Sequence, residues 1–323
     1  MNDLTIPVSV IVPNYNSGYY LKELIESINH GLWPAEILVI DDCSTDGSLD
    51  LAFKLQSQYK NIQVLQMKSN GGAAEARKFG IFAASQALVA LVDADDLLET
   101  DALAVAYFTI TSSRADICIF ELWSFNVENK WRHYANPDVL PKTGRDAMLL
   151  TLGCWRMHAA GISKKNLYKT AYQEFSEISF NADELITRLV LSNAALIVGC
   201  EKKYFYRSHS AATTHTLNAR RLGGLRSHLW LLNFARDYPE APFKSMVRGA
   251  IGEACFYWSN RKLIGKVQTL SALRDFVPKI ARLPGIWPLL WRSPKHLIGL
   301  MFLSVVIRGG TEASNKANNV NQI

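Results

Sequence analysis

Short apolar runs alternate with amphipathic stretches over residues 8–122. The runs are rich in Val, Ile and Leu, which is typical of strands buried on both faces. They cover residues 8–13, 36–42, 62–67, 87–95 and 115–122. The stretches between them repeat apolar residues with helical spacing, which predicts helices over 19–32, 46–59 and 72–85. This alternation predicts an α/β domain with a mostly parallel central sheet flanked by helices, whose ligand site lies at the carboxyl ends of the strands.

The alternation ends before the last third of the chain, where the pattern becomes helical and rich in aromatic residues. We therefore expect an α/β domain over 1–216, a helical C-terminal extension over 217–310, and a disordered polar tail over 311–323. The chain has 323 residues, of which 49% are hydrophobic and 20% charged, so it is long enough for a large core and an appendage.

Charge and cysteine content limit the partners and the compartment. The net charge of +6 is modest and fits either anionic ligands or a lipid surface, and we expect no nucleic-acid partner. The N-terminus has no basic segment followed by a long apolar run, so we expect a cytoplasmic protein without a secretory signal. The five cysteines form no C-x-x-C pair and are expected to be buried thiols in a reducing compartment. They are Cys43, Cys118, Cys154, Cys200 and Cys255.

Aspartates gather where two of the predicted strands end, at residues 41–42 and 93–96. Single aspartates after strands often cap the next helix or make an Asx-turn, and we expect this of Asp46 and Asp101. Three carboxylates on one turn, in "DADD", exceed what capping requires, because their mutual repulsion needs a cation to offset it. An oxygen-only site of this kind suits Mn²⁺ or Mg²⁺ bound together with a diphosphate.

Two common nucleotide motifs are absent from the sequence. The first strand is not followed by G-x-G-x-x-G, and no G-x-x-x-x-G-K-[ST] occurs. The loop "SNGGAAEAR" at 69–77 enters a helix, where backbone N–H groups and Arg77 are placed to meet an anion. A glycine pair is also a common helix entry, so this loop alone does not identify a ligand.

Four segments, in this order and spacing, resemble one known family. "VSVIVPNYN", "ILVIDDCSTDGS", "NGGAAEARKFGI" and "VALVDADDLLETDAL" look like the donor half of a family 2 glycosyltransferase with the Rossmann-like GT-A fold. The resemblance implies a donor half over about 1–122 and an acceptor half over about 123–216. It also implies that Mn²⁺ or Mg²⁺ is the cofactor and that a UDP-sugar is the donor.

The resemblance assigns roles to the residues of the donor half. It implies that Pro13, Tyr15 and Asn16 form the walls of a uracil pocket. Asp42 matches the aspartate that accepts the uracil imide N–H, and Arg77 matches a basic residue near the nucleotide.

The same resemblance assigns the acidic turn to the diphosphate. It implies that Asp93 lies near the ribose and that Asp95 binds the metal that bridges the diphosphate. Asp96 is placed to share the metal, and the sequence leaves open which carboxylate bonds the ion directly.

The segment "FNADELITRLVL" resembles the family's acceptor signature, a Glu-Asp pair that opens a helix. Here Ala182 stands in place of the glutamate, Asp183 matches the general base, and Glu184 is the reserve candidate. Side chains of consecutive helical residues point about 100° apart, so the two acids are not expected to enter one site together. The alternative is that both acids only favour the positive end of the helix.

Two cations follow the strand-like "KKYFYR". The resemblance implies that Arg207 and His209 belong to a lid that neutralises the departing UDP, although surface loops also carry such residues without a catalytic role. The resemblance as a whole implies metal-dependent single displacement with inversion onto a hydroxyl of a glycan or glycolipid acceptor, in cell-surface polysaccharide or lipopolysaccharide synthesis.

Other functions remain as alternatives. The missing glutamate before Asp183 leaves room for a non-catalytic member that binds nucleotide-sugar or membrane. A D-x-D-x-[TV] phosphotransferase is disfavoured because Leu97 occupies the Thr/Val position, and a sugar nucleotide pyrophosphorylase because no glycine-rich, arginine-bearing loop follows the first strand.

The C-terminal segment 280–310 mixes tryptophans and leucines with Arg, Lys and His. Its longest uncharged run, 297–307, is shorter than the roughly 20 residues that span a bilayer. A helix on an anionic lipid surface, which would make the protein peripheral on the inner face of the plasma membrane, fits this composition. A helical hairpin that packs on the α/β domain or on a homodimer partner fits it equally.

Overall fold

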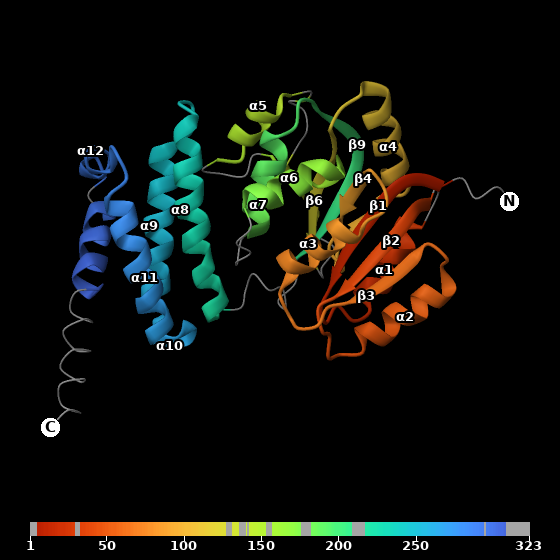
Figure 1. Ribbon diagram of the computed structural model, residues 1–323, viewed down its shortest axis with the longest axis horizontal. Helices are drawn as coiled ribbons and strands as arrows, with labels where there is room; N and C mark the ends of the chain where they lie inside the picture. Colours follow the sequence, from red (N-terminus) through yellow and green to blue (C-terminus); the bar gives the residue numbers. More distant parts are fainter. Residues whose placement is uncertain are drawn as a thin grey trace. The chain divides into compact units, whose positions relative to one another are not determined.

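The computed structural model describes residues 5–29, 33–126, 131–135, 140, 142–152, 157–175, 182–208, 217–293 and 295–307. The chain divides into two compact units (Figure 1). The sheet unit comprises Met1–Ile178 and Asp183–Ala212, and the helical unit comprises Ser179–Ala182 and Thr213–Ile323.

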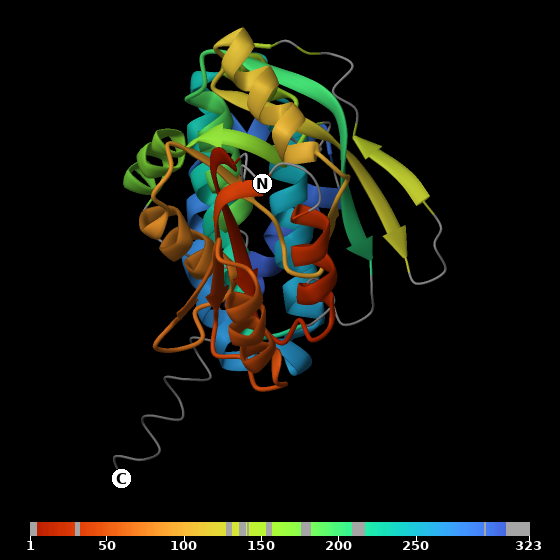
Figure 2. The ribbon, with the colours of Figure 1, turned by 90° about the vertical axis from the view of Figure 1, so that its right-hand side faces the viewer.

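The sheet unit is built on one nine-stranded sheet within the described residues, in the order β3-β2-β1-β4-β8-β6-β9-β5, with β7 beside β6. Figure 2 shows β6 between β9 and β7. Strands β1 to β4 are mutually parallel, as are β6 and β9, whereas β5, β7 and β8 are antiparallel to their neighbours. The strands are β1 Thr5–Asn14, β2 Trp33–Asp41, β3 Ile62–Gln66, β4 Leu88–Leu91, β5 Leu97–Leu98, β6 Ile117–Asn126, β7 Trp131–Ala135, β8 Gly161–Lys164 and β9 Ile197–Ser208.

Helices cover this sheet, which confirms the predicted α/β class. Helix α3 packs against β1 and β2, whereas α4 packs against β6, β8 and β9. Gly80 permits the close approach of α3, because a Cβ there would lie 2.4 Å from Cγ2 of Ile11. The helices are α1 Tyr20–Ile28, α2 Ser48–Gln58, α3 Ala73–Ala83, α4 Ala102–Ser113, α5 Gly144–Leu149, α6 Lys165–Glu174 and α7 Ala182–Ser192.

The predicted strand over 87–95 ends earlier than expected. Strand β4 stops at Leu91, and the chain turns through residues 92–96 before β5 begins. Strand β5 then pairs with β9, with Leu97 opposite Phe205 and Leu98 opposite Tyr204. The acidic turn, residues 93–96, therefore lies between a central strand and an edge strand of the same sheet.

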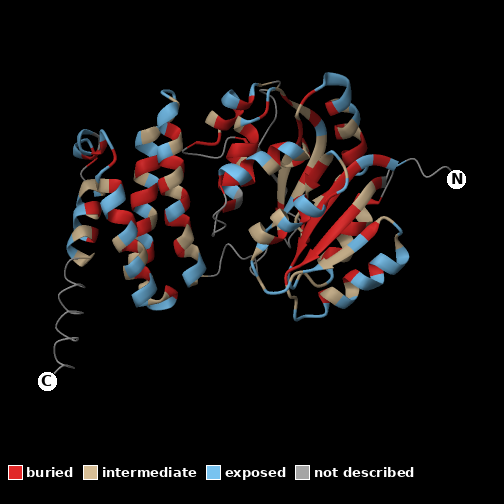
Figure 3. Ribbon diagram, in the orientation of Figure 1, coloured by how far each residue is buried: buried red, intermediate tan, exposed pale blue. Residues whose placement is uncertain are grey.

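The helical unit contains the predicted C-terminal helices. Its described part is built of η2 Ala219–Gly223, α8 Gly224–Phe234, η3 Ala235–Asp237, α9 Phe243–Ser259, α10 Arg261–Ile264, α11 Lys266–Ala281, α12 Ile286–Trp291 and helical backbone over 295–307. Figure 3 shows buried residues along the inner sides of these helices. The predicted disordered tail lies outside the described residues. No helix in the described part of the chain is long and apolar enough to cross a membrane.

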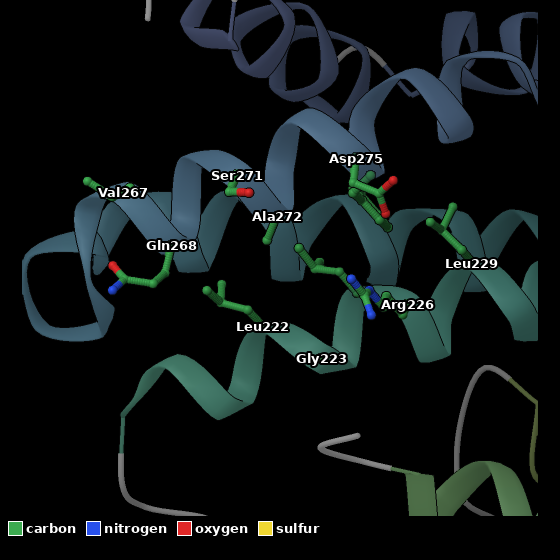
Figure 4. Close-up of a pocket in the computed structure, with 11 residues that line it drawn as sticks. Leu222, Gly223, Arg226, Leu229, Val267, Gln268, Ser271, Ala272 and Asp275 are labelled. Atoms are coloured by element: carbon green, nitrogen blue, oxygen red, sulfur yellow. The ribbon is translucent and has the colours of Figure 1, made fainter. Parts of the chain in front are cut away.

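A groove of about 570 Å³ runs between α8 and α11 (Figure 4). Leucines and Phe276 line it together with Arg226 and Asp275. The groove belongs to the helical unit, whereas the acidic turn belongs to the sheet unit.

The cysteine prediction holds in part. Cys43, Cys118, Cys200 and Cys255 are free thiols, and Cys118 and Cys200 are buried as expected. Cys43 and Cys255 are only half-buried, and Cys154 lies outside the described residues.

Candidate active site

The acidic turn is anchored to β9 by its last residue. Asp96 is buried, and its Oδ2 accepts a hydrogen bond from the Tyr204 hydroxyl at 2.5 Å. Its Oδ1 accepts from the backbone N–H of Arg207 at 2.8 Å. Burial, and then the charges of Asp93 and Asp95, raise the pKa of Asp96 well above its ordinary value. Asp96 thus anchors the acidic turn to β9.

Arg207 connects three elements at the same place. Its Nε donates to the backbone carbonyl of Asp95 at 2.6 Å, and its Nη2 donates to Oε2 of Glu23, on α1, at 2.7 Å. The guanidinium also lies 4.5 Å from the ring centroid of Tyr20 and 4.7 Å from that of Phe125. The sequence predicted Arg207 as a partner of UDP, and the structure brings it to the acidic turn.

Asp93 is paired with Arg77, the cation of the "SNGGAAEAR" loop and helix. Nη2 of Arg77 lies 2.7 Å from Oδ1 and 3.0 Å from Oδ2 of Asp93. The backbone N–H of Asp93 donates to the Tyr204 hydroxyl at 3.2 Å. The structure therefore brings two predicted nucleotide-binding residues, Arg77 and Asp93, into direct contact.

Asp42 holds the glycine loop that precedes α3. It is buried, and its two carboxylate oxygens accept the backbone N–H groups of Gly71 and Gly72, each at 2.7 Å. The side chain of Asn70 donates to the backbone carbonyl of Asp42 at 3.0 Å. Gly72 has φ +86°, a conformation that favours glycine. The uracil contact expected of Asp42 remains a prediction.

Asn14 and Asp41 form a contact that the sequence analysis did not identify. They are opposite each other in the parallel β1–β2 pair, and Nδ2 of Asn14 donates to Oδ1 of Asp41 at 2.8 Å. Both are buried, and Oδ2 of Asp41 accepts the backbone N–H of Ser44 at 3.1 Å. The sequence signal for this contact was the presence of polar residues at the ends of two successive predicted strands.

The predicted uracil-pocket residues lie at the end of β1. Pro13 is buried, whereas Tyr15 and Asn16 are exposed. Oδ1 of Asn16 accepts the backbone N–H of Thr45 at 2.7 Å, and φ of Asn16 is +52°. The loops after β1 and β2 are therefore joined, and the ring of Tyr15 is left accessible beside them.

The expected helix caps differ in outcome. Asp46 lies one residue before the N-cap, Gly47, and its Oδ1 accepts the backbone N–H of Ser48 at 2.9 Å, which is the expected Asx-turn at the start of α2. Asp101 precedes α4 with φ +62° and makes no side-chain capping bond, so the prediction for Asp101 is wrong.

On the acceptor side, Asp183 lies in the first turn of α7, and its side chain is outside the described part of the structure. Glu184 accepts from Nη1 of Arg188 at 3.3 Å, and Nη2 of the buried Arg188 donates to the carbonyl of Thr151 at 3.2 Å. His209 lies outside the described residues.

The residues around the acidic turn limit how a metal could be held. In the described part of the chain, no three His, Cys, Asp or Glu side chains are grouped so as to bind an ion. Asp96 is engaged by Tyr204 and Arg207, and Asp93 by Arg77. Asp95 is partly exposed. The donor set fits Mn²⁺ or Mg²⁺ through Asp95 when a diphosphate supplies further oxygens.

Comparison with known proteins gives a consistent assignment. The model of the family "Glycosyl transferase family 2" matches residues 9–170. Glycosyltransferase GlyG of Streptococcus pneumoniae is 25% identical over 220 residues, which cover 65% of this chain and 73% of GlyG. Poly(ribitol-phosphate) beta-N-acetylglucosaminyltransferase TarS of Staphylococcus aureus is 30% identical over 207 residues, which cover 61% of this chain and only 35% of TarS.

The fold is shared with a solved structure. The crystal structure of S. aureus TarS 1–349 in complex with UDP-GlcNAc matches with a TM-score of 0.66 and 21% identity, over 94% of this chain and 92% of that chain. This likeness confirms the predicted fold, a central sheet flanked by helices with a helical C-terminal region.

Proposed function

Because the chain belongs to glycosyl transferase family 2 and is a glycosyltransferase, we propose that it transfers the sugar of a UDP-sugar to a hydroxyl of a cell-surface glycan or glycolipid. One observation carries this proposal. Hydrogen bonds join four segments that are far apart in the sequence, at the carboxyl ends of β1, β2 and β4. These segments are residues 41–46, 70–77, 93–96 and 204–207.

The donor assignment is supported by the relatives and by the loops after β1 and β2. TarS structures are in complex with UDP-GlcNAc and with UDP. In this chain, the accessible ring of Tyr15 offers a stacking surface for a base, next to Asn16 and the loop after β2. The acceptor is proposed to be a surface polymer, since TarS is named for poly(ribitol-phosphate) and TuaG of Bacillus subtilis for teichuronic acid. Lipopolysaccharide is the other acceptor class that the sequence suggests.

Metal dependence is the next part of the proposal. Asp95 would hold Mn²⁺ or Mg²⁺ together with diphosphate oxygens, and Asp93 would face the ribose. When bound, the ion supplies positive charge to the departing diphosphate. Asp96 acts as the support of this turn, because both of its oxygens already accept hydrogen bonds.

The chemical step requires a base on the acceptor side. Asp183 takes the proton of the acceptor hydroxyl, whose oxygen attacks the anomeric carbon while the bond from that carbon to the diphosphate breaks. The new glycosidic bond then has inverted configuration, and UDP leaves with the electron pair. Arg77 and Arg207, close to the acidic turn, add positive charge beside this leaving group.

A cytoplasmic location is also proposed. The buried free thiols of Cys118 and Cys200 support a reducing compartment.

A donor panel tests the proposal. UDP-GlcNAc, UDP-glucose and UDP-galactose are each incubated with the full chain, with and without Mn²⁺, and thermal stabilisation and UDP release are measured. We expect stabilisation by at least one UDP-sugar, larger with Mn²⁺, and UDP release that increases when poly(ribitol phosphate) is added. Stabilisation by none of the three UDP-sugars, with or without Mn²⁺, would overturn the donor assignment.

One alternative has a specific observation in its favour. Ala182 stands where the family has a glutamate beside the base, which suits a member that binds nucleotide-sugar without transferring it. Tight donor binding with no UDP release on any of a broad set of acceptors would support this alternative.

A further inference from the structure

Each of the last two described helical segments exposes large apolar side chains. On α12, Trp287 and Trp291 are four residues apart and therefore on one side of the helix. In the helical segment 295–307, the exposed residues recur with i, i+3, i+4 and i+7 spacing. These side chains are 46% to 72% exposed, and we call them the outer stripe: Trp287, Trp291, Ile298, Met301, Phe302 and Val305.

The opposite side of the same segment is packed within the helical unit. Leu300 and Leu303 are buried, at 1% and 0% exposure. A Cβ added at Gly299 would lie 3.2 Å from Sγ of Cys255, so the segment packs closely on α9. The core contacts of this segment are thus satisfied without the outer stripe, and a solvent-facing stripe of large apolar residues marks an interaction surface.

Charge indicates the kind of partner. No Asp or Glu occurs between Phe276 and Ile307, whereas Arg and Lys occur four times. Lys279 is paired with Asp275, but Arg292 and Lys295 are exposed, and in the sequence they lie between the two parts of the outer stripe. We propose that the outer stripe binds the surface of an anionic membrane, with the apolar side chains in the lipid interface and Arg292 and Lys295 on the phosphates.

The dimensions fit binding along a membrane surface. Residues 295–307 span about 20 Å as a helix, less than the roughly 30 Å of a bilayer core. Tryptophans such as Trp287 and Trp291 favour the boundary between lipid and water. A second copy of the chain is a weaker occupant, because residues 276–307 of that copy offer no carboxylate to pair with Arg292 and Lys295.

Vesicle sedimentation of the full chain tests this proposal. The vesicles are phosphatidylcholine alone or phosphatidylcholine with about a third phosphatidylglycerol. We expect about tenfold or stronger partition onto the anionic vesicles, and a decrease when NaCl is raised from about 0.1 M to about 1 M. Absence of binding to anionic vesicles, or equal binding to both kinds, would overturn the proposal.

Variants locate the surface. The double variant Trp291→Ser/Phe302→Ser is expected to lower partition by about tenfold or more. The matched control Leu263→Ser/Val267→Ser removes side chains that are 70% and 77% exposed on α10 and α11, and it should leave partition unchanged. An equal loss in both double variants would contradict the assignment of the outer stripe.

Two further measurements separate the remaining outcomes. Arg292→Gln/Lys295→Gln, which changes only exposed charges, should lower partition onto anionic vesicles even if the serine variant unfolds in circular dichroism. Sedimentation velocity tests whether a second copy of the chain covers this face. If the chain binds no vesicles but forms a dimer, and Trp291→Ser/Phe302→Ser dissociates that dimer, the face is an interface between copies.

Discussion

The buried hydroxyl of Tyr204 donates to Oδ2 of buried Asp96 at 2.5 Å, across more than a hundred residues of sequence. The same hydroxyl accepts the backbone N–H of Asp93 at 3.2 Å. Tyr204 therefore fixes both ends of the acidic turn, and Asp95 lies between the two fixed residues.

Replacing Tyr204 by Phe should weaken the fold and the donor site together. The change leaves an oxygen of Asp96 buried without its donor, which costs about 1 to 3 kcal/mol of the free energy of unfolding in urea denaturation. UDP affinity in the presence of Mn²⁺ should fall as the turn loosens. Tyr206→Phe, a more exposed tyrosine of the same strand, is the control and should have little effect on either quantity.

Asp95→Asn should remove Mn²⁺-dependent UDP binding without loss of thermal stability. The residue is partly exposed at a strand end, so its carboxylate is not needed for the core. Calorimetric titration of UDP with and without Mn²⁺ measures the effect. Asp101→Asn makes the same chemical change at an exposed position nearby and should bind UDP like the parent. Equal Mn²⁺-dependent affinity in Asp95→Asn and the parent would exclude Asp95 as the metal ligand.

Asp183→Asn should slow glycosyl transfer by about 10² to 10⁴, because an amide cannot take the acceptor proton. Donor affinity should be retained, since the proposed uracil and metal contacts lie on other elements. Glu184→Gln is the matched control, and its side chain already accepts from Arg188. If Glu184→Gln alone abolishes transfer, Glu184 is the base, and if neither variant slows transfer, the acceptor site lies elsewhere.

Asp116 should make stability depend on pH in the acid range. Burial alone would raise its pKa, but hydrogen bonds from Lys164 and from the N–H groups of Ala195 and Leu196 lower the pKa below 3.8. A lowered pKa contributes stability that is present above 3.8 and is lost as pH falls through the folded-state value. The difference in unfolding free energy between the parent and Asp116→Asn should therefore be largest at neutral pH and shrink as the pH falls below 3.8. A difference that does not change with pH would contradict this role.

Gly80→Ala should destabilise the sheet unit, because the new methyl would meet Ile11 at 2.4 Å where α3 packs on β1. Overpacking of this kind costs about 1 to 3 kcal/mol. Gly249→Ala on α9 is the control, since nothing lies within 4 Å of its added Cβ. Because alanine favours a helix more than glycine does, Gly249→Ala should be more stable than the parent by up to about 1 kcal/mol. If Gly80→Ala and Gly249→Ala change the melting temperature equally, the close packing of α3 on β1 is contradicted.

Much of the fold could be predicted because the hydrophobic period is local. The strands over 8–13, 36–42 and 62–67 and the helices between them lie where the pattern indicates. The acidic turn was also identified, because four residues at a strand end carried its signal. Local pattern could not assign separate tasks to its carboxylates.

The task of Asp96 depends on a distant strand. Its burial follows from the pairing of β5 with β9 and from Tyr204, and neither is visible in the sequence around residue 96. Arg207 bonds to Glu23 and to the carbonyl of Asp95, and neither partner could be predicted from the sequence, for the same reason. Contacts between elements far apart in sequence decide which polar groups remain available to a ligand.

The dependence of the acidic turn on β9 limits which segments of the enzyme can be exchanged with those of a relative. All the donor motifs precede residue 104, yet the turn reaches its bonded form only when Tyr204 and Arg207 are in place. During synthesis, nucleotide-sugar binding should appear only after β9 has left the ribosome. A chimera that takes residues 1–122 from a relative must therefore also take, or match, the residues that face this turn from β9.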